Sequence, residues 1–133
     1  MWSAAAEEVY KVQVGYGILA GMTAVNQFCM IGNHAFVTGG SLVRKDVPPF
    51  VKGAREPLSY VGINSIGLRR RGFTPEKIRE IQNIYRLLYQ RNYNTTQASE
   101  IIEAEMEATP ERDEILQFIK NSKRGIMKGY FQR

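Results

Sequence analysis

Residues 19–48 read LAGMTA VNQFCM IGNHAF VTGGSL VRKDVP, five hexads that each open on an aliphatic residue. The openers are Leu19, Val25, Ile31, Val37 and Val43. A second column, mostly of small residues, stands four positions after each opener, at Thr23, Cys29, Ala35, Ser41 and Val47. Both columns have the same parity, so they point to one face of an extended chain. Six-residue periodicity predicts a β-helix solenoid, whose rungs bury their apolar column by stacking.

Glycines mark the places where such a chain would bend. Gly21, Gly32, Gly39 and Gly40 allow backbone angles that are costly for other residues. The alternative interpretation is a pair of ordinary alternating strands joined by glycine turns. We favour coiling rungs, because five consecutive hexads rarely arise by chance.

Residues 48–73 break the period. Their prolines and glycines indicate an irregular connecting loop. Beyond the loop the apolar spacing becomes helical, with Thr74 as N-cap, Pro75 at the first helical position, and a helix to about Arg91.

Two further helices are expected. Asn94 or Thr95 opens one that runs through Met106, and Thr109-Pro110 opens another that ends before Gly125. From residue 122 onward we expect a basic tail. The predicted fold is therefore mainly β plus α: an atypical segment over 1–16, a truncated parallel β-helix over 17–50, a connecting and nucleotide-binding loop over 51–73, and a helical domain over 74–133.

Composition limits the class of protein. The net charge of +5 favours an anionic partner such as nucleic acid, a membrane surface or a phosphorylated ligand. The lone Cys29 has no partner for an internal disulfide and is expected to be a buried thiol. No apolar run is long enough to span a bilayer, so a soluble cytoplasmic protein is expected.

The quoted stretch continues into a longer pattern. The runs GMTAVNQFCMIGNHAFVTGGSLVRKDVPPFV and GINSIGLRRRGFTPEKI, with the later SKRGI, closely resemble the acyl-carrier-protein-dependent UDP-N-acetylglucosamine O-acyltransferases of lipid A synthesis. The resemblance covers roughly residues 17–130. It implies a left-handed β-helix, a C-terminal helical domain, and a homotrimer with active sites between neighbouring subunits. It also implies transfer of an R-3-hydroxyacyl chain from acyl carrier protein to the glucosamine 3-hydroxyl of UDP-N-acetylglucosamine, without a metal or organic cofactor.

The resemblance assigns roles to residues of the hexads. Gly21 matches a glycine whose backbone amide stabilises the oxyanion, and Gly39 matches a position that limits acyl-chain length. Asn26 stands where most members have a histidine, in the motif AVHQF; its amide could position substrate but cannot accept a proton near neutral pH. Gln27 matches a contact to the nucleotide sugar. His34, the sole histidine, matches a position outside the catalytic centre and is expected at the prism surface or a subunit interface.

The loop supplies the expected nucleotide site. Arg70 and Arg71 match the family's phosphate-binding pair, and planar guanidinium groups suit a diphosphate. Asn64 matches a nucleotide contact, two residues before a family acid that this chain replaces by Ile66.

These residues do not include the catalytic base that the resemblance implies. The family's base is a histidine from an earlier coil, which this sequence lacks, so we expect weak substrate binding with little or no turnover. The alternative is a non-catalytic trimeric module that binds acyl carrier protein or assembles with full-length subunits, steered by Lys120, Lys123, Arg124 and Lys128. Nucleic-acid binding ranks third, since no reading motif accompanies the charge.

Overall fold

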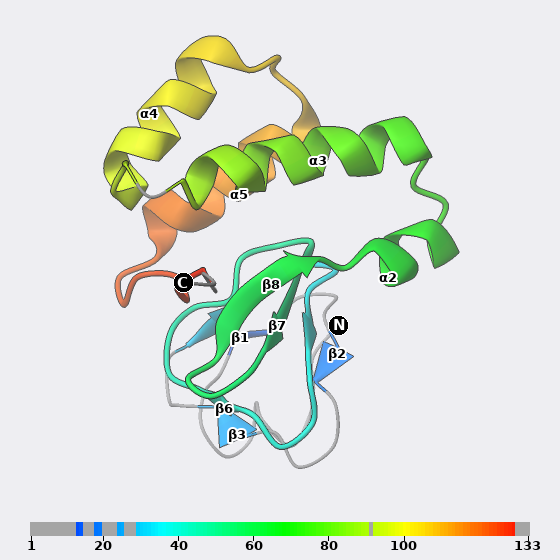
Figure 1. The fold of residues 1–133 in the computed structure, drawn as a ribbon, viewed down its shortest axis with the longest axis vertical. Coiled ribbons are helices and arrows are strands. Elements are labelled where there is room, and N and C mark those ends of the chain that lie inside the picture. Colours follow the sequence, from blue (N-terminus) through cyan, green and yellow to red (C-terminus); the bar gives the residue numbers. More distant parts are fainter. Residues whose placement is uncertain (1–12, 15–17, 20–23, 26–28, 91, 130–133) are drawn as a thin grey trace.

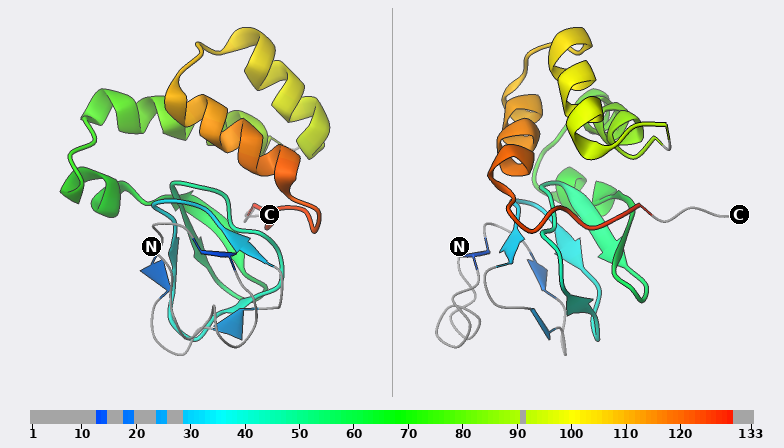
Figure 2. Two further views of the ribbon diagram at one scale, coloured as in Figure 1. Left: turned by 180° about the vertical axis from the view of Figure 1, so that it is seen from behind. Right: turned by 90° about the vertical axis from the view of Figure 1, so that its left-hand side faces the viewer.

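The computed structural model describes residues 13–14, 18–19, 24–25, 29–90 and 92–129. A part built of short strands carries a group of helices at one end (Figure 1). The views from behind and from the side show the same two-part arrangement (Figure 2). The β part comes first in the sequence, as the change from a six-residue to a helical period predicts.

Six strands of two residues each form the first part of the fold. They are β1 (Gln13–Val14), β2 (Ile18–Leu19), β3 (Ala24–Val25), β4 (Met30–Ile31), β5 (Phe36–Val37) and β6 (Leu42–Val43). Each of the first three pairs in parallel with the strand three places later, so that Ile18 lies beside Phe36 and Ala24 beside Leu42. Three hexads therefore complete one turn with three faces. Parallel pairing excludes the hairpin alternative, because a tight turn joins antiparallel strands.

The interior of the coil contains the columns that the hexads predict. The buried members among the described side chains are Ile31, Val37 and Val43 from the openers, and Cys29, Ala35, Ser41 and Val47 from the small column. The residue before each opener in β4, β5 and β6 is only half-buried. This alternation is what a β-strand with one buried face requires.

The segment expected to be an irregular loop is ordered, and that prediction was wrong. Strands β7 (Val51–Ala54) and β8 (Ser59–Ile63) form an antiparallel hairpin, and helix α2 (Ser65–Arg70) follows it. Strand β7 also pairs in parallel with β5 and so extends one face of the coil. Pro57 occupies the hairpin turn, where its missing N–H costs no ladder hydrogen bond. The proline that suggested a loop is a turn residue between two strands.

Three helices follow, and each begins at the expected cap. Helix α3 (Pro75–Leu88) starts after Thr74, α4 (Thr95–Glu105) after Asn94, and α5 (Pro110–Asn121) after Thr109; each cap side chain accepts a hydrogen bond from a backbone N–H three residues later. Helix α3 ends at Leu88, shortly before the predicted end.

The helices pack on the β part through the apolar face of α3. Its buried residues are Ile78, Ile81, Ile84, Tyr85 and Leu88. The Tyr85 hydroxyl donates to the Pro49 carbonyl oxygen over 2.5 Å. The ring of Tyr60 on β8 stacks on Tyr89 at 4.4 Å between centroids. Aromatic rings therefore join the hairpin to α3.

The segment expected to be a basic tail returns to the β part. Ile126 forms a parallel bridge with Asp46, and Gly129 forms one with Tyr60. The buried Asp46 carboxylate accepts from the Ser122 hydroxyl at 2.5 Å and from the Met30 N–H at 2.7 Å. The end of α5 is thus fixed to the coil.

Candidate functional site

Asn64 lies at the junction between β8 and α2, where its side chain is held on two sides. As N-cap of α2 it accepts a hydrogen bond from the Gly67 N–H at 3.4 Å. Its amide Nδ2 donates to the His34 carbonyl oxygen at 3.0 Å, and its backbone N–H donates to the Phe50 carbonyl oxygen at 2.8 Å. These hydrogen bonds fix the orientation of the half-buried amide.

His34 occupies a corner of the coil between β4 and β5. Its φ of 61° is in the left-handed region, which histidine adopts more readily than most residues. The imidazole stacks on the Phe50 ring at 5.7 Å and meets the edge of Phe73 at 5.2 Å. An Arg71 guanidinium nitrogen lies 2.6 Å from Nδ1. Burial, reinforced by the positive charge of Arg71, lowers the pKa of His34 below its usual value.

Three consecutive arginines form the C-terminal end of α2: Arg69 and Arg70 are its last two residues, and Arg71 is its C-cap. Arg69, Arg70 and Arg71 are all exposed, while Leu68 is buried and anchors the helix. Ile66, 65% exposed, lies one turn before Arg70 on the same helix face. Guanidinium groups present paired N–H donors, so this end of α2 can bind a phosphate or diphosphate through charge-assisted hydrogen bonds.

The predicted site residues fall into three groups. Asn64 and Arg71 are brought together through His34, and Arg70 is next to them on α2. Gly39 is exposed at the next corner of the coil, between β5 and β6. Gly21, Asn26 and Gln27 lie outside the described residues.

Sequence reasoning missed the aromatic part of the site. The rings of Phe50 and Phe73 enclose His34, although they are far apart in the chain. The sequence offered one signal, which is that both aromatics occur inside the matched runs DVPPF and GLRRRGF. Among the described residues no group of three or more histidine, cysteine and carboxylate side chains could hold a metal ion. No helix in the same set is long and apolar enough to cross a membrane.

Comparison with known proteins defines the class. The chain combines a coil of short parallel strands with a C-terminal group of helices. Residues 46–127 match the family model described as UDP-N-acetylglucosamine O-acyltransferase, domain 2. The chain belongs to the UDP-N-acetylglucosamine O-acyltransferase family.

Relatives cover most of the chain. An acyl-[acyl-carrier-protein]–UDP-N-acetylglucosamine O-acyltransferase from Myxococcus xanthus is 36% identical over 111 residues, which are 84% of this chain and 43% of that protein. The enzyme of the same name from Aliivibrio salmonicida is 39% identical over 113 residues, 85% of this chain and 43% of that protein. The chain thus spans a little under half the length of these curated relatives.

Solved structures of the same family superimpose on this chain. The crystal structure of a UDP-N-acetylglucosamine acyltransferase from Bacteroides fragilis superimposes with a TM-score of 0.85 at 43% identity, over 89% of this chain and 47% of that one. The Arabidopsis UDP-N-acetylglucosamine acyltransferase superimposes with a TM-score of 0.80 at 34% identity, over 88% of this chain and 44% of that one.

Proposed function

We propose that this chain binds UDP-N-acetylglucosamine as the nucleotide-binding half of an acyltransferase of lipid A synthesis. The observation that carries the proposal is the fixed Asn64 amide beside the exposed arginines of α2. In the proposed complex Arg70 and Arg71 bind the diphosphate, and Asn64 contacts the nucleotide. Gln27 and Asn26 contact the sugar, Gly39 leaves room for the acyl chain, and the Gly21 amide stabilises the oxyanion.

The reaction of the whole enzyme would move an R-3-hydroxyacyl chain from acyl carrier protein to the glucosamine 3-hydroxyl. That step needs a base to take the hydroxyl proton. His34, the sole histidine of the chain, has Nδ1 engaged by Arg71 and its ring held between two phenylalanines. It does not fit the base, and an amide at Asn26 cannot take the proton. These residues alone would therefore bind substrate and turn over little.

Assembly belongs to the same proposal. We expect a left-handed coil, a cytoplasmic protein and a homotrimer whose clefts combine groups from neighbouring subunits. Met30, Phe36 and Leu42 are half-buried on the outer side of the coil, one on each face. Apolar side chains on the outside of a short solenoid would gain stability from a neighbouring subunit.

The binding test compares two arginines. Isothermal titration calorimetry measures the Kd of the untagged chain for UDP-N-acetylglucosamine, and the measurement is repeated for Arg70→Ala and Arg79→Ala. Arg79 is an exposed arginine on α3, so it controls for net charge. We expect Arg70→Ala to raise Kd about tenfold, the worth of one charge-assisted hydrogen bond, and Arg79→Ala to leave it unchanged. Equal Kd values for both variants would contradict the proposal.

Turnover is measured separately, with acyl-loaded acyl carrier protein and UDP-N-acetylglucosamine. We expect no product above background from the chain alone. Product formation at the rate of a complete homologue would refute the view that these residues lack a base.

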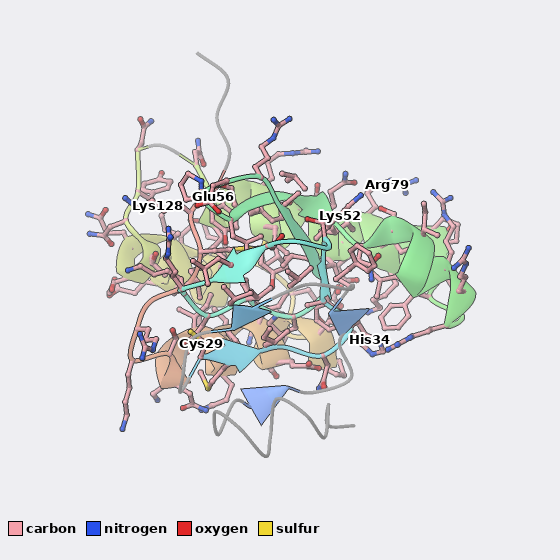
Figure 3. All side chains as sticks on the ribbon, turned by 90° about the horizontal axis from the view of Figure 1, so that it is seen from below. Cys29, His34, Lys52, Glu56, Arg79 and Lys128 are labelled. Carbon is pink, nitrogen blue, oxygen red and sulfur yellow. The ribbon has the colours of Figure 1, made fainter. Side chains whose placement is uncertain are left out.

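A non-catalytic role in binding acyl carrier protein has its own support. Lys120, Lys123, Arg124 and Lys128 are all exposed. Figure 3 shows Lys128 on the side of the molecule away from His34, so Lys128 is separate from the proposed nucleotide site. Capture of the chain by immobilised acyl carrier protein at low salt, lost at high salt, would favour this role, since screening weakens exposed charge contacts.

A further inference from the structure

His34 contacts both Asn64 and Arg71 from a part of the chain distant from α2. Its backbone carbonyl accepts a hydrogen bond from Asn64 Nδ2 at 3.0 Å, across 30 positions of sequence. Its ring Nδ1 lies 2.6 Å from an Arg71 guanidinium nitrogen, across 37 positions. Two groups of the proposed nucleotide site are thus held from a single corner of the coil.

The ring of His34 is itself fixed. The left-handed backbone at φ 61° sets the direction in which the side chain leaves the chain. Phe50 stacks on one side of the imidazole at 5.7 Å and Phe73 meets it edge-on at 5.2 Å. The Phe50 carbonyl also accepts from the Asn64 N–H. These contacts orient the imidazole, so that its Nδ1 faces the Arg71 guanidinium.

The contact also determines the protonation of the ring. Arginine has donors only, so Nδ1 must be unprotonated and the ring proton must lie on Nε2. Among the described residues packed on His34, Arg71 is the charged one; Asn64, Phe50 and Phe73 carry no charge. A protonated His34 would lose the acceptor and repel the guanidinium.

We propose that His34 is a positioning residue that holds the Arg71 guanidinium through its ring, and the Asn64 amide through its backbone carbonyl, in the orientation that receives the diphosphate of a nucleotide sugar. The inference rests on the proposed function for its ligand. It differs from the expectation of a prism-surface or subunit-interface residue, because it gives His34 a role inside the binding site.

The ligand-free test uses the single histidine of the chain. In the untagged, ¹⁵N-labelled protein, long-range proton–nitrogen spectra report both ring nitrogens of His34 without ambiguity. We expect the tautomer with the proton on Nε2 at neutral pH and a pKa below the ordinary value. Arg71→Ala should raise that pKa, because it removes the neighbouring positive charge. A proton on Nδ1, or a pKa unmoved by Arg71→Ala, would refute the contact.

The binding test separates acceptor, ring and charge. His34→Phe keeps the aromatic packing but removes the acceptor. His34→Asn keeps an acceptor and tolerates the left-handed backbone but does not titrate. Against UDP-N-acetylglucosamine at about pH 7.5, we expect Kd to rise about fivefold in His34→Phe and to stay within about twofold in His34→Asn, in keeping with one hydrogen bond to a charged group. The substrate's diphosphate is a diester and does not titrate in this range.

The pH dependence of the affinity distinguishes this role from a purely structural one, which would not change with the protonation of His34. Between about pH 7.5 and 5, the affinity of the wild-type chain should fall about fivefold as His34 becomes protonated, and that of His34→Asn should not. Affinity that rises on acidification would instead make the imidazolium a direct ligand and overturn the positioning role.

A double-mutant cycle completes the design. If His34 acts through Arg71, His34→Phe should add nothing in the Arg71→Ala background. Additive effects would refute the inference. If Arg70→Ala weakens binding as expected but His34→Phe binds like the wild-type chain, only the role of His34 is overturned. If Arg70→Ala does not change the affinity, the proposed function itself is overturned.

Discussion

Gly32 offers the sharpest test of how the coil is closed. It is buried at the corner after β4, and its N–H donates to the Val47 carbonyl oxygen over 2.7 Å. A Cβ at this position would lie 2.5 Å from Pro49 N, 2.7 Å from its Cα and 2.8 Å from its Cδ. Favourable carbon contacts begin near about 3.5 Å, so the Pro49 segment would have to move by roughly 1 Å.

The cost of Gly32→Ala follows from what that movement disturbs. Overpacking against backbone costs about 1–3 kcal/mol. The displaced segment also carries the Phe50 N–H to Asn33 hydrogen bond and the acceptor for Tyr85, each worth about 1 kcal/mol. Alanine returns about 0.4–1 kcal/mol by restricting the unfolded chain. We expect a net loss of about 3 kcal/mol.

Gly40→Ala is the matched control. Its φ is +77°, but nothing lies within 4 Å of the added Cβ, so the cost is backbone strain of about 1–2 kcal/mol, partly offset by the unfolded state. Urea unfolding followed by far-ultraviolet circular dichroism gives both values. A Gly32→Ala loss below about 0.5 kcal/mol, or one smaller than the Gly40→Ala loss, would refute the close approach of Pro49.

Three further predictions follow from buried groups. Asp46→Ala should lower the free energy of unfolding by about 2–4 kcal/mol, because the Met30 N–H and the Ser122 hydroxyl lose their acceptor; an unchanged urea midpoint would contradict this. Burial raises the pKa of Tyr60 to about 12, so this phenol ionises near pH 10 in the unfolded chain but stays protonated in the folded one. Its contribution to stability should be fully present below about pH 10 and be lost as pH rises toward 12, so Tyr60→Phe should show a smaller loss of stability over that range. Burial likewise raises the pKa of the Cys29 thiol, so a thiol reagent should react with the native chain no faster than it unfolds, and immediate labelling would refute the buried column.

The sequence predicts those parts of the fold whose signals are local. The hexads place Ile31, Val37 and Val43 on one face of an extended chain, and these side chains are buried. The helix starts are equally local, because a cap and a following proline act within one turn, as at Thr74 and Thr109. These signals need no knowledge of distant residues.

The hairpin and the returning C-terminal segment could not be predicted in this way. Strand β7 forms because the edge of β5 is free to pair, and this partner lies outside any local window. Ile126 and Gly129 are held by bridges to Asp46 and Tyr60, which a short basic stretch does not indicate. Glycine and proline mark turns, but they do not tell whether the residues between them pair.

The candidate site also has a part that local sequence signals predict and a part that depends on contacts between distant residues. Its arginines are visible as a run, and the resemblance gives them a role. His34 joins them only because a left-handed corner, two phenylalanines and the end of α2 meet in space. Such a meeting is a property of the folded chain.

The link between Asp46 and Ser122 spans 76 positions and has a consequence for synthesis on the ribosome. While the helices are still being translated, the Asp46 carboxylate lacks its hydroxyl partner and the hairpin edge at Tyr60 lacks its bridge. The nascent coil can stack its rungs early, but its bridges to the C-terminal segment form only after residue 129 has left the exit tunnel. A pause late in translation would therefore hold the chain in a form with an open edge, the state from which strand-to-strand aggregation starts.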